Sequence, residues 1–177
     1  MPDLQQEMDE YFAEYTRRWN KVNDYASLIE MWDQDDDRPF YRGMEKPGFF
    51  ENWERLKLYW DPEHCHKLVT ALQYNFVNVR AKLVTPDVAV AYYDAEWDMK
   101  ALMGPAISGT DPCISVFRRT PDGWKMNSYV EACTHPAAYE DEFADKEDKC
   151  RPSFRKLLIE RCEVECRNCR IPCKGTG

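Results

Sequence analysis

Apolar side chains recur every three or four positions over the first sixty residues of the chain, and every second position after that. The first spacing is typical of one buried face of an amphipathic helix. It predicts a long first helix, with these residues on one face: Leu4, Met8, Tyr11, Phe12, Tyr15, Trp19 and Val22. A second, shorter helix is predicted near residues 25–32. A third follows Pro47-Gly48, with Phe49, Trp53, Leu56 and Trp60 on one side.

Beyond Asp61-Pro62 the period changes to two, which is typical of half-buried strands. Strands are predicted over 67–84, 87–103, 111–120 and 123–133, and a short extended piece is predicted at Phe40-Tyr41. The tight turn Pro121-Asp122-Gly123 separates the last two long strands. Helices first and strands afterwards favour an α+β domain, with three helices packed on one face of an antiparallel sheet.

Composition narrows the class of protein. A chain of 177 residues with 44% hydrophobic and 14% aromatic residues is long enough to bury a single core. The net charge of −8 argues against nucleic acid as a partner, because phosphate binding needs clustered Lys and Arg. The first residues do not resemble a signal peptide, and no apolar run approaches the ~20 residues of a membrane helix. We therefore expect a soluble, cytoplasmic protein whose cysteines stay reduced.

The chain changes character from about residue 137, where it becomes acidic, then basic, then rich in cysteine. We expect a domain over 1–136 and an extension over 137–177 that carries a short helix near 152–161. Four cysteines close together near the end can supply thiolates to one structural zinc ion or iron–sulfur cluster: Cys162, Cys166, Cys169 and Cys173. Disulfides formed after isolation and unpaired thiols are the alternatives. Four protein ligands would leave no open position for a substrate.

Alternation along the strands predicts which side chains face the helices. Over 88–99 the apolar set is Ala89, Ala91, Tyr93, Ala95, Trp97 and Met99. The other set carries the acidic ladder Asp94, Glu96 and Asp98, which we expect to face solvent or a dimer partner. In the last strand the inward set is predicted to be Trp124, Met126, Ser128 and Val130. These rings line either an apolar pocket that suits an aromatic ligand or an ordinary core.

Two other clusters have simple structural interpretations. The acidic run at 33–37 is interpreted as a solvated turn and not a metal site. The segment His64-Cys65-His66 is interpreted as a loop, because no third metal ligand stands at a diagnostic spacing.

The strand pair in VFRRTPDGWKMNSYVEA and the helix segment LIEMWDQDD resemble the nuclear transport factor 2-like superfamily, over roughly residues 5–136. This resemblance implies a cone-shaped fold that also serves ketosteroid isomerases and SnoaL-like polyketide cyclases. The segments FYRGMEKPGFFENWERLKLYWDP, YYDAEWDMK and SYVEA look like cofactor-free lyases that release formaldehyde from lignin-derived diaryl compounds. The resemblance also implies a dimer through the outer face of the sheet.

Alignment with the isomerases implies that the base of the cone lies at residues 40–46. Tyr41 is then the proton donor or acceptor, and Glu45 or Lys46 is the base or charge stabiliser. Substrate contacts are expected from rings and small polar side chains inside the cone: Tyr15, Trp19, Trp53, Tyr93, Trp97, Met126 and Ser128.

The leading hypothesis is a lyase, dehydratase or isomerase that needs no cofactor for catalysis and acts on an aromatic small molecule by acid–base chemistry. The alternative is a non-catalytic dimeric module that binds a small molecule or a partner.

Overall fold

The computed structural model describes residues 3–21, 26–43, 48–61, 69–132, 153–154 and 156–157. The named helices are α1 (Leu4–Trp19), α2 (Ala26–Ile29) and α3 (Trp53–Trp60). The strands are β1 (Phe40–Arg42), β2 (Val69–Thr85), β3 (Val88–Ala101), β4 (Ala106–Thr120) and β5 (Gly123–Glu131). The mixed α+β class predicted from the sequence is therefore confirmed.

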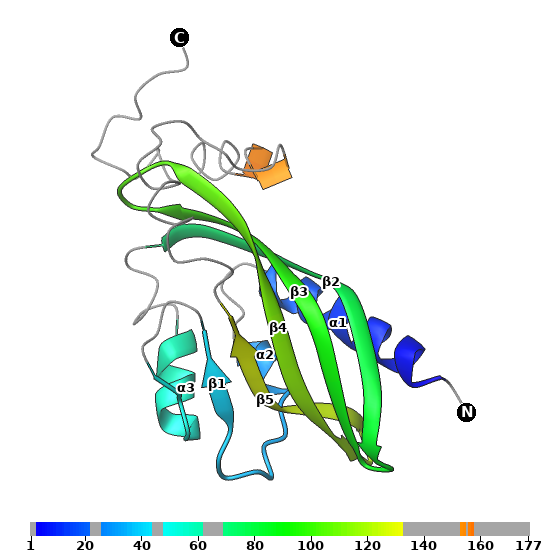
Figure 1. Cartoon of the computed structure of the whole chain (residues 1–177). Coiled ribbons are helices and arrows are strands. Elements are labelled where there is room, and N and C mark those ends of the chain that lie inside the picture. The colour runs from blue at the N-terminus through cyan, green and yellow to red at the C-terminus, as the bar shows by residue number, and fades with distance from the viewer. Residues whose placement is uncertain are drawn as a thin grey trace.

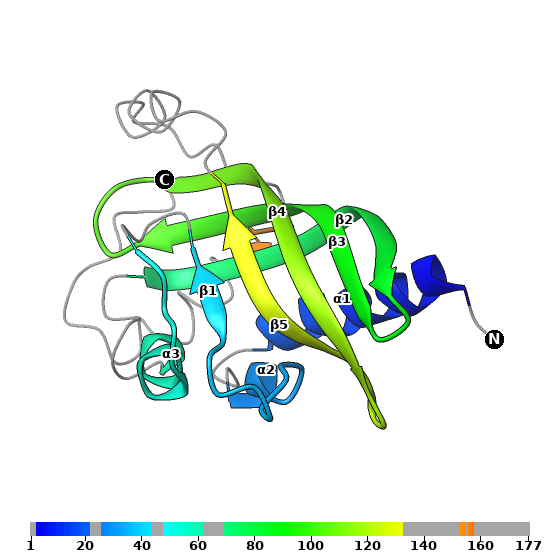
Figure 2. The same ribbon diagram turned by 60° about the horizontal axis from the view of Figure 1, so that its bottom comes forward.

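One curved five-stranded sheet organises the molecule, in the order β1-β5-β4-β3-β2 (Figure 1). The long strands pair antiparallel, whereas the short β1 pairs parallel with β5 at the edge. Helix α1 lies across one face of the sheet, and α3 lies beyond the edge formed by β1, as both ribbon views show (Figure 2). The sheet therefore arches over an interior that the helices close from one side, and we call its helix-facing surface the inner face.

The predicted stripe of the first helix forms most of the contact between α1 and the sheet. Its buried residues are Met8, Tyr11, Phe12, Tyr15 and Trp19. Phe12 packs against Tyr93 of β3 with ring centroids 4.2 Å apart and against Phe117 of β4 at 5.8 Å. Ring pairs of this kind add about 0.5–1.5 kcal/mol each beyond their buried area, so the pattern of large rings in the sequence sets the position of α1.

Helix α2 is shorter than predicted, and α3 begins at Trp53, so Phe49 is not part of it. The start of α3 is set by Asn52, whose Oδ1 accepts a hydrogen bond from the backbone N–H of Arg55 at 2.9 Å. An Asn side chain in this position satisfies a backbone donor that the first turn of a helix cannot satisfy itself.

Strand β4 begins five residues before the predicted position. The predicted strands leave residues 104–110 between them, but Gly109 lies inside β4, opposite Trp97. A Cβ atom at Gly109 would lie 2.4 Å from Cζ2 of the Trp97 indole. The glycine is thus explained by the close approach of a ring, and the turn is instead made around Gly104, at a φ of 95°.

The predicted inner set of β3 is buried from Ala89 to Trp97, whereas Met99 is only partly buried. On the outer face Asp94 accepts a hydrogen bond from Asn78, and Glu96 accepts one from Asn75. The prediction that Asp98 faces solvent is wrong, because its side chain is only 1% exposed. Further along the same outer face, Phe154 buries itself against Ala71 and Ala106, so this end of the sheet is covered by part of the C-terminal segment.

The predicted inner set of β5 is correct only for its first half. The pairing between β4 and β5 shifts between Val116 and Phe117, so that Phe117 pairs with Met126 and Val116 with Ser128. One extra residue in β5 reverses the alternation, as a β-bulge does. Trp124 and Met126 face inward, but Ser128 does not, and the inner face continues with Tyr129 and Glu131, which are 3% and 5% exposed.

The acidic run after α2 is more than a solvated turn. Asp33 is 3% exposed and forms an ion pair with Arg118, with Oδ2 and Nε 2.5 Å apart. Asp36 accepts a hydrogen bond from the side chain of Asn127, and its backbone oxygen accepts one from the indole of Trp53 at 2.6 Å. These contacts tie the run to β4, β5 and α3.

Among the residues described, no helix is both long enough and apolar enough to span a lipid bilayer.

Candidate active site

The interior has two ends that differ in their polar groups. Near the β4–β5 turn it is filled by rings and small side chains, and we call this the ring-packed end: Tyr11, Phe12, Tyr93, Phe117 and Met126. Toward the end of β5 several polar atoms face inward among the rings, and we call this the polar end: Tyr15, Trp32, Trp60, Cys113, Tyr129 and Glu131. All eleven residues belong to the core, Glu131 excepted, which is itself buried.

Glu131 is the chemically notable residue of the polar end. It lies opposite Cys113 in the β4–β5 ladder, and Cys113 lies opposite Tyr93 in the β3–β4 ladder. The Sγ atom of Cys113 is 3.5 Å from the hydroxyl of Tyr129. A carboxylate is thus held on the inner face beside a thiol and a phenol, at a depth where bulk water does not screen it.

The influence of this carboxylate extends to its neighbours. Burial raises the pKa of Tyr129 well above its usual value, and the charge of Glu131 raises it further. The pKa of Cys113 is raised by burial first and by Glu131 second. Burial also raises the pKa of Tyr15, an effect that hydrogen bonding from the indoles of Trp19 and Trp32 reduces. The two phenols and the thiol therefore stay protonated near neutral pH, as hydrogen-bond donors and not as bases.

A second carboxylate lies one step away on the same face. Asp111 is fully buried, two residues before Cys113 in β4, and it accepts a hydrogen bond from the indole nitrogen of Trp97. Residues diagonal to one another on one face of a sheet are about 7–8 Å apart, which places Asp111 and Glu131 in one neighbourhood. The indole bond holds the Asp111 side chain in position.

The structure places most of the predicted site residues around this interior. Tyr41 is buried and stacks on Tyr129, with centroids 5.0 Å apart and planes at 10°. Tyr15 and Trp19 lie on the inner stripe of α1, as predicted. Trp97 is also inside, although its nitrogen is engaged by Asp111.

Other residues predicted to contact a substrate are exposed in part, already hydrogen-bonded or turned outward. Trp53 is only partly buried, and its nitrogen donates to the backbone of Asp36. The hydroxyl of Tyr93 is 2.7 Å from Ser115 Oγ, and Met126 accepts a weak contact from that Ser115 at 3.8 Å. Ser128 lies beyond the bulge, and its Oγ donates to Asn127. Its predicted inward orientation is wrong, because the bulge reverses the alternation.

Several predictions lie outside the described residues: Glu45, Lys46, the segment at 64–66 and the four cysteines Cys162, Cys166, Cys169 and Cys173. Within the ranges that the structure describes, no group of three His, Cys, Asp or Glu side chains is arranged to hold a metal ion.

Sequence reasoning missed Glu131 and Tyr129 as inward-facing residues. Strict alternation from Trp124 assigns both to the outer face, and nothing in the local sequence marks the extra residue of the bulge. The segment SYVEA, which contains both, was part of the family resemblance, so that motif was the one available signal.

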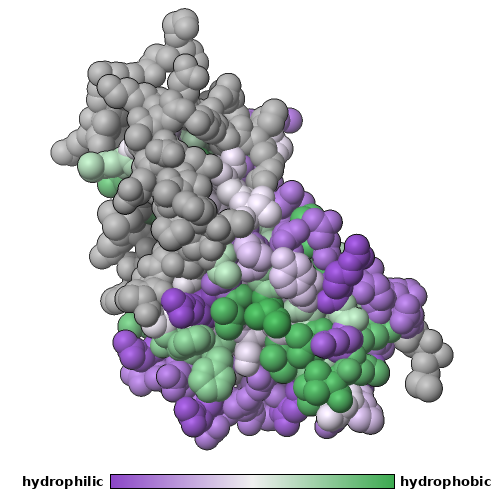
Figure 3. Space-filling view, in the orientation of Figure 1, coloured by the Kyte–Doolittle hydropathy of each residue, from purple (hydrophilic) through white to green (hydrophobic). Residues whose placement is uncertain are grey.

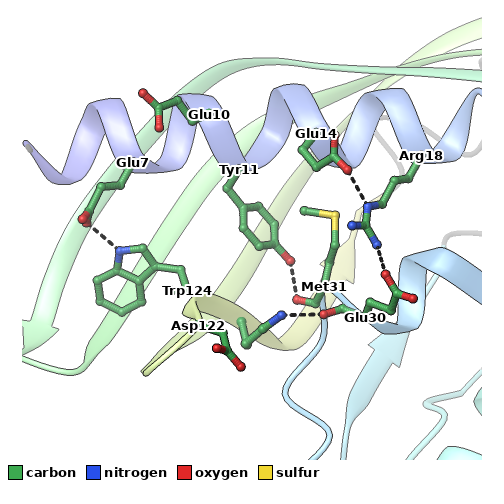
Figure 4. A pocket seen from close by; sticks show the side chains of 11 residues that line it. Glu7, Glu10, Tyr11, Glu14, Arg18, Glu30, Met31, Asp122 and Trp124 are labelled. Carbon is green, nitrogen blue, oxygen red and sulfur yellow. Dashed lines mark hydrogen bonds and ion pairs between the residues drawn. The ribbon is translucent and has the colours of Figure 1, made fainter.

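A separate groove opens on the surface between α1, the residue pair after α2 and the β4–β5 turn (Figure 4). It has a volume of about 380 Å³, and five acidic side chains line it: Glu7, Glu10, Glu14, Glu30 and Asp122. Arg18 is 2.7 Å from Glu14 and 2.8 Å from Glu30, and Trp124 donates to Glu7 at 2.8 Å. The contact of Trp124 with Glu7 holds α1 against the turn, and the ion pairs of Arg18 give Glu14 and Glu30 a structural role.

Comparison with known proteins supports the fold. No model of a protein family matches the sequence, and no curated protein is significantly similar to it. Solved structures are similar in shape. A proposed dehydratase of the nuclear transport factor 2-like family from Streptomyces avermitilis superposes with a TM-score of 0.62 at 16% identity, covering 74% of this chain and 96% of that protein.

Two proteins of Novosphingobium aromaticivorans are also similar. A proposed aromatic ring hydroxylase superposes with a TM-score of 0.63 at 14% identity, covering 75% of this chain and 90% of that one. A proposed scytalone dehydratase superposes with a TM-score of 0.59 at 8% identity, covering 72% of this chain and 83% of that protein. At such low identities the likeness concerns the fold. The chain has the nuclear transport factor 2-like fold.

Proposed function

We propose that this chain is an enzyme that acts on an aromatic small molecule by acid–base chemistry, without a cofactor, in the manner of a dehydratase or an isomerase. The observation that carries the proposal is the carboxylate of Glu131, buried on the inner face beside Cys113 and Tyr129. Two structural neighbours proposed to be dehydratases support the reaction class. A fold shared by many activities does not decide among them, so the residues of the polar end must carry the argument.

Glu131 is the group proposed to exchange protons with the substrate. General acid–base catalysis needs a carboxyl group within reach of the reacting atoms and sheltered from bulk water. The neighbouring phenols have raised pKa values, chiefly because they are buried, so they keep their protons and donate hydrogen bonds. The division of work is therefore a carboxylate that moves the proton and phenols that orient the substrate.

The rings around Glu131 set the class of substrate. Tyr41 stacks on Tyr129, and Trp60 lies 5.5 Å from both Tyr41 and Trp32, centroid to centroid. Flat walls of this kind suit a substrate with one or two aromatic rings.

The specific reaction that we propose is deformylation of a lignin-derived diaryl diol. The phenol of the substrate gives up its proton and the benzylic hydroxyl leaves as water, which forms a quinone methide. Loss of the terminal hydroxyl proton then breaks the carbon–carbon bond, releases formaldehyde and restores the phenol. The products are a stilbene, formaldehyde and water, so the reaction is balanced without an oxidant or a reductant.

Glu131→Gln tests the proposal directly. We expect turnover of phenolic diaryl diols, followed by formaldehyde and stilbene, to fall by about 10²–10⁴-fold, the usual contribution of a general acid–base group. The matched control is Glu96→Gln, because Glu96 lies on the outer face of β3 and contacts Asn75. Equal turnover in both variants would refute the role of Glu131. Saturable binding without any turnover by the unmodified protein would favour the non-catalytic binding module.

The sequence-based candidates Tyr41, Glu45 and Lys46 remain part of the proposal. Tyr41→Phe, Glu45→Gln and Lys46→Met in the same assay would reveal a second proton-transfer group beside Glu131. Of the three, Tyr41 is the residue that the structure describes. Its ring stacks on Tyr129 at the polar end.

A dimer through the outer face is also proposed. Hydrophobic side chains gather on the sheet face turned away from α1 (Figure 3). Tyr92 and Ile114 pair across β3 and β4 there, and they are 51% and 46% exposed. Burial of such a patch against a second copy would stabilise a dimer. Analytical ultracentrifugation of the chain and of Ile114→Lys would test this, because the charge should shift the equilibrium toward the monomer.

A further inference from the structure

One end of the outer sheet face is covered by the chain's own C-terminal segment. Phe154 is fully buried, yet it belongs to a small cluster with Ala71 and Ala106 that is separate from the main core. Leu157, one helical turn later, packs against the same cluster. We call the described residues of this segment the C-terminal strap (orange in Figure 1): Ser153, Phe154, Lys156 and Leu157.

The pairing of the strands explains why a ring fits at this place. Ala71 of β2 and Ala106 of β4 both pair with Lys100 of β3, so the three residues form one row across the sheet. The alanines leave space on either side of Lys100, whose Nζ donates a hydrogen bond to the backbone oxygen of Gly104 in the β3–β4 turn. We call this row, together with Asp98 two residues earlier in β3, the strap site.

The strap and the outer face carry opposite charges. The stretch from 151 to 159 has no acidic residue, and it contains Arg151, Arg155 and Lys156. The outer face carries Glu96 and Asp98 next to the row of alanines, and Asp98 is only 1% exposed. Because opposite charges attract most strongly where water screens them least, a basic segment suits this acidic surface in a chain whose net charge is −8.

The strap is joined to the sheet by a long stretch of chain. Cys113, which pairs with the last residue of β5, lies roughly 23 Å from Ala106 along β4. Residues 133–152 reach up to roughly 66 Å when extended, so their length is ample. One ring and one leucine bind weakly between separate molecules, but such a tether gives an effective concentration in the millimolar range. At micromolar protein the strap of the same copy therefore outcompetes the strap of another.

We propose that the strap site is a docking site for a basic helical turn that carries an aromatic ring and, three residues later, a leucine. The C-terminal strap occupies this site in cis and thereby closes it to a second copy of the chain. Lys100 lies roughly 26 Å from Tyr92 along β3. Two copies can then associate at the end of the outer face that holds Tyr92 and Ile114, but not over the whole face. The strap site lies on the opposite face of the sheet from the interior, so it does not depend on the proposed reaction.

The test uses a fluorescently labelled peptide with the sequence of residues 151–161, RPSFRKLLIER, which contains no cysteine. In the whole chain, Phe154→Asp vacates the strap site, because burial of an unpaired carboxylate is unfavourable. We expect the peptide to bind Phe154→Asp at least about 10-fold more tightly than the unmodified chain, since one buried ring contributes at least this factor. Fluorescence anisotropy measures both affinities. More salt should weaken the binding, because salt screens the charges.

Two further variants locate the bound peptide. Ala106→Trp, combined with Phe154→Asp, places a ring in the strap site and should abolish peptide binding. Ala71→Glu in the same background should do so from β2, so the result does not rest on the folding of one variant. The matched control is Ile114→Lys, because Ile114 lies on the same strand and the same face at the other end of the sheet. That variant should bind the peptide as Phe154→Asp alone does.

Four outcomes would overturn the proposal: no peptide binding to Phe154→Asp, equal binding to the unmodified chain, binding that both site variants leave unchanged, or equal binding of a peptide with alanine in place of the phenylalanine. None of these readouts depends on turnover. Failure of the strap site is therefore distinct from failure of the proposed function, which would show itself as unchanged turnover in Glu131→Gln.

Discussion

The ring-packed end and the polar end of the interior are equally buried, yet they treat their polar atoms in opposite ways. At the first, Tyr11 and Tyr93 each bond a fixed neighbour, and Phe12 and Phe117 fill the remaining space. At the second, the Tyr15 hydroxyl has only the indoles of Trp19 and Trp32 beside it, near the carboxylate of Glu131, and the indole nitrogen of Trp60 has no hydrogen-bond partner. Burial is therefore a poor guide to function in this fold, and hydrogen-bond satisfaction is a better one.

The largest expected effect tests whether the ring-packed end supplies stability. Phe117 is fully buried and packs against Tyr11 and Phe12. We expect Phe117→Ala to lower the free energy of unfolding by about 3–5 kcal/mol, because it removes a ring and leaves a cavity. Urea denaturation followed by tryptophan fluorescence measures this. A loss below about 1 kcal/mol would mean that this end is not the main core.

A somewhat smaller effect is expected where β4 passes under Trp97. The added methyl of Gly109→Ala would lie 2.4 Å from the indole and must displace it. We expect a loss of about 1–3 kcal/mol in the free energy of unfolding, as for other overpacked sites. The hydrogen bond from Trp97 to Asp111 should weaken as well. The control is Gly48→Ala, since a Cβ at Gly48 meets nothing within 4 Å.

The sharpest test of the comparison is a pair of identical substitutions. Tyr15 and Tyr93 are both fully buried, but the Tyr93 hydroxyl lies 2.7 Å from the Ser115 hydroxyl, whereas the Tyr15 hydroxyl has only the indoles of Trp19 and Trp32 beside it. We expect Tyr93→Phe to cost about 1–2 kcal/mol of unfolding free energy, because it leaves Ser115 with a lost bond. Tyr15→Phe should cost less, because no acceptor for the Tyr15 hydroxyl proton lies within hydrogen-bond distance. Thermal and urea unfolding of both variants measures the difference, and equal losses would erase the distinction between the two ends.

The smallest effect is the pH dependence of stability that comes from buried tyrosines at the ring-packed end and the polar end. Burial raises the pKa values of Tyr11, Tyr93 and Tyr129 well above their usual value of 10.0. Above about pH 10 the unfolded chain releases these protons while the folded chain keeps them, so stability falls as pH rises. Below pH 8 these groups should contribute no pH dependence. Unfolding measured from pH 8 to 11 tests this, and stability that rises over that window would contradict the prediction.

The local pattern of apolar residues was enough to predict the helices and strands. The stripe from Met8 to Trp19 and the alternation from Ala89 to Trp97 each repeat with the period of one structure, so α1 and β3 could be predicted from residue type alone. The turn at Pro121-Asp122-Gly123 has chemistry that specifies its geometry, since Gly123 adopts a φ of 101°.

Contacts between distant segments decided which side chains face the interior. A single extra residue in β5 turned Ser128 outward and Glu131 inward, and such a bulge depends on pairing with β4 and not on local propensity. Gly109 could not be distinguished from a turn glycine without the ring of Trp97 above it. The sequence by itself determined that rings would fill a cone. Only the tertiary structure decided which polar atoms those rings enclose, because hydrogen-bond partners are set by residues far apart in the chain.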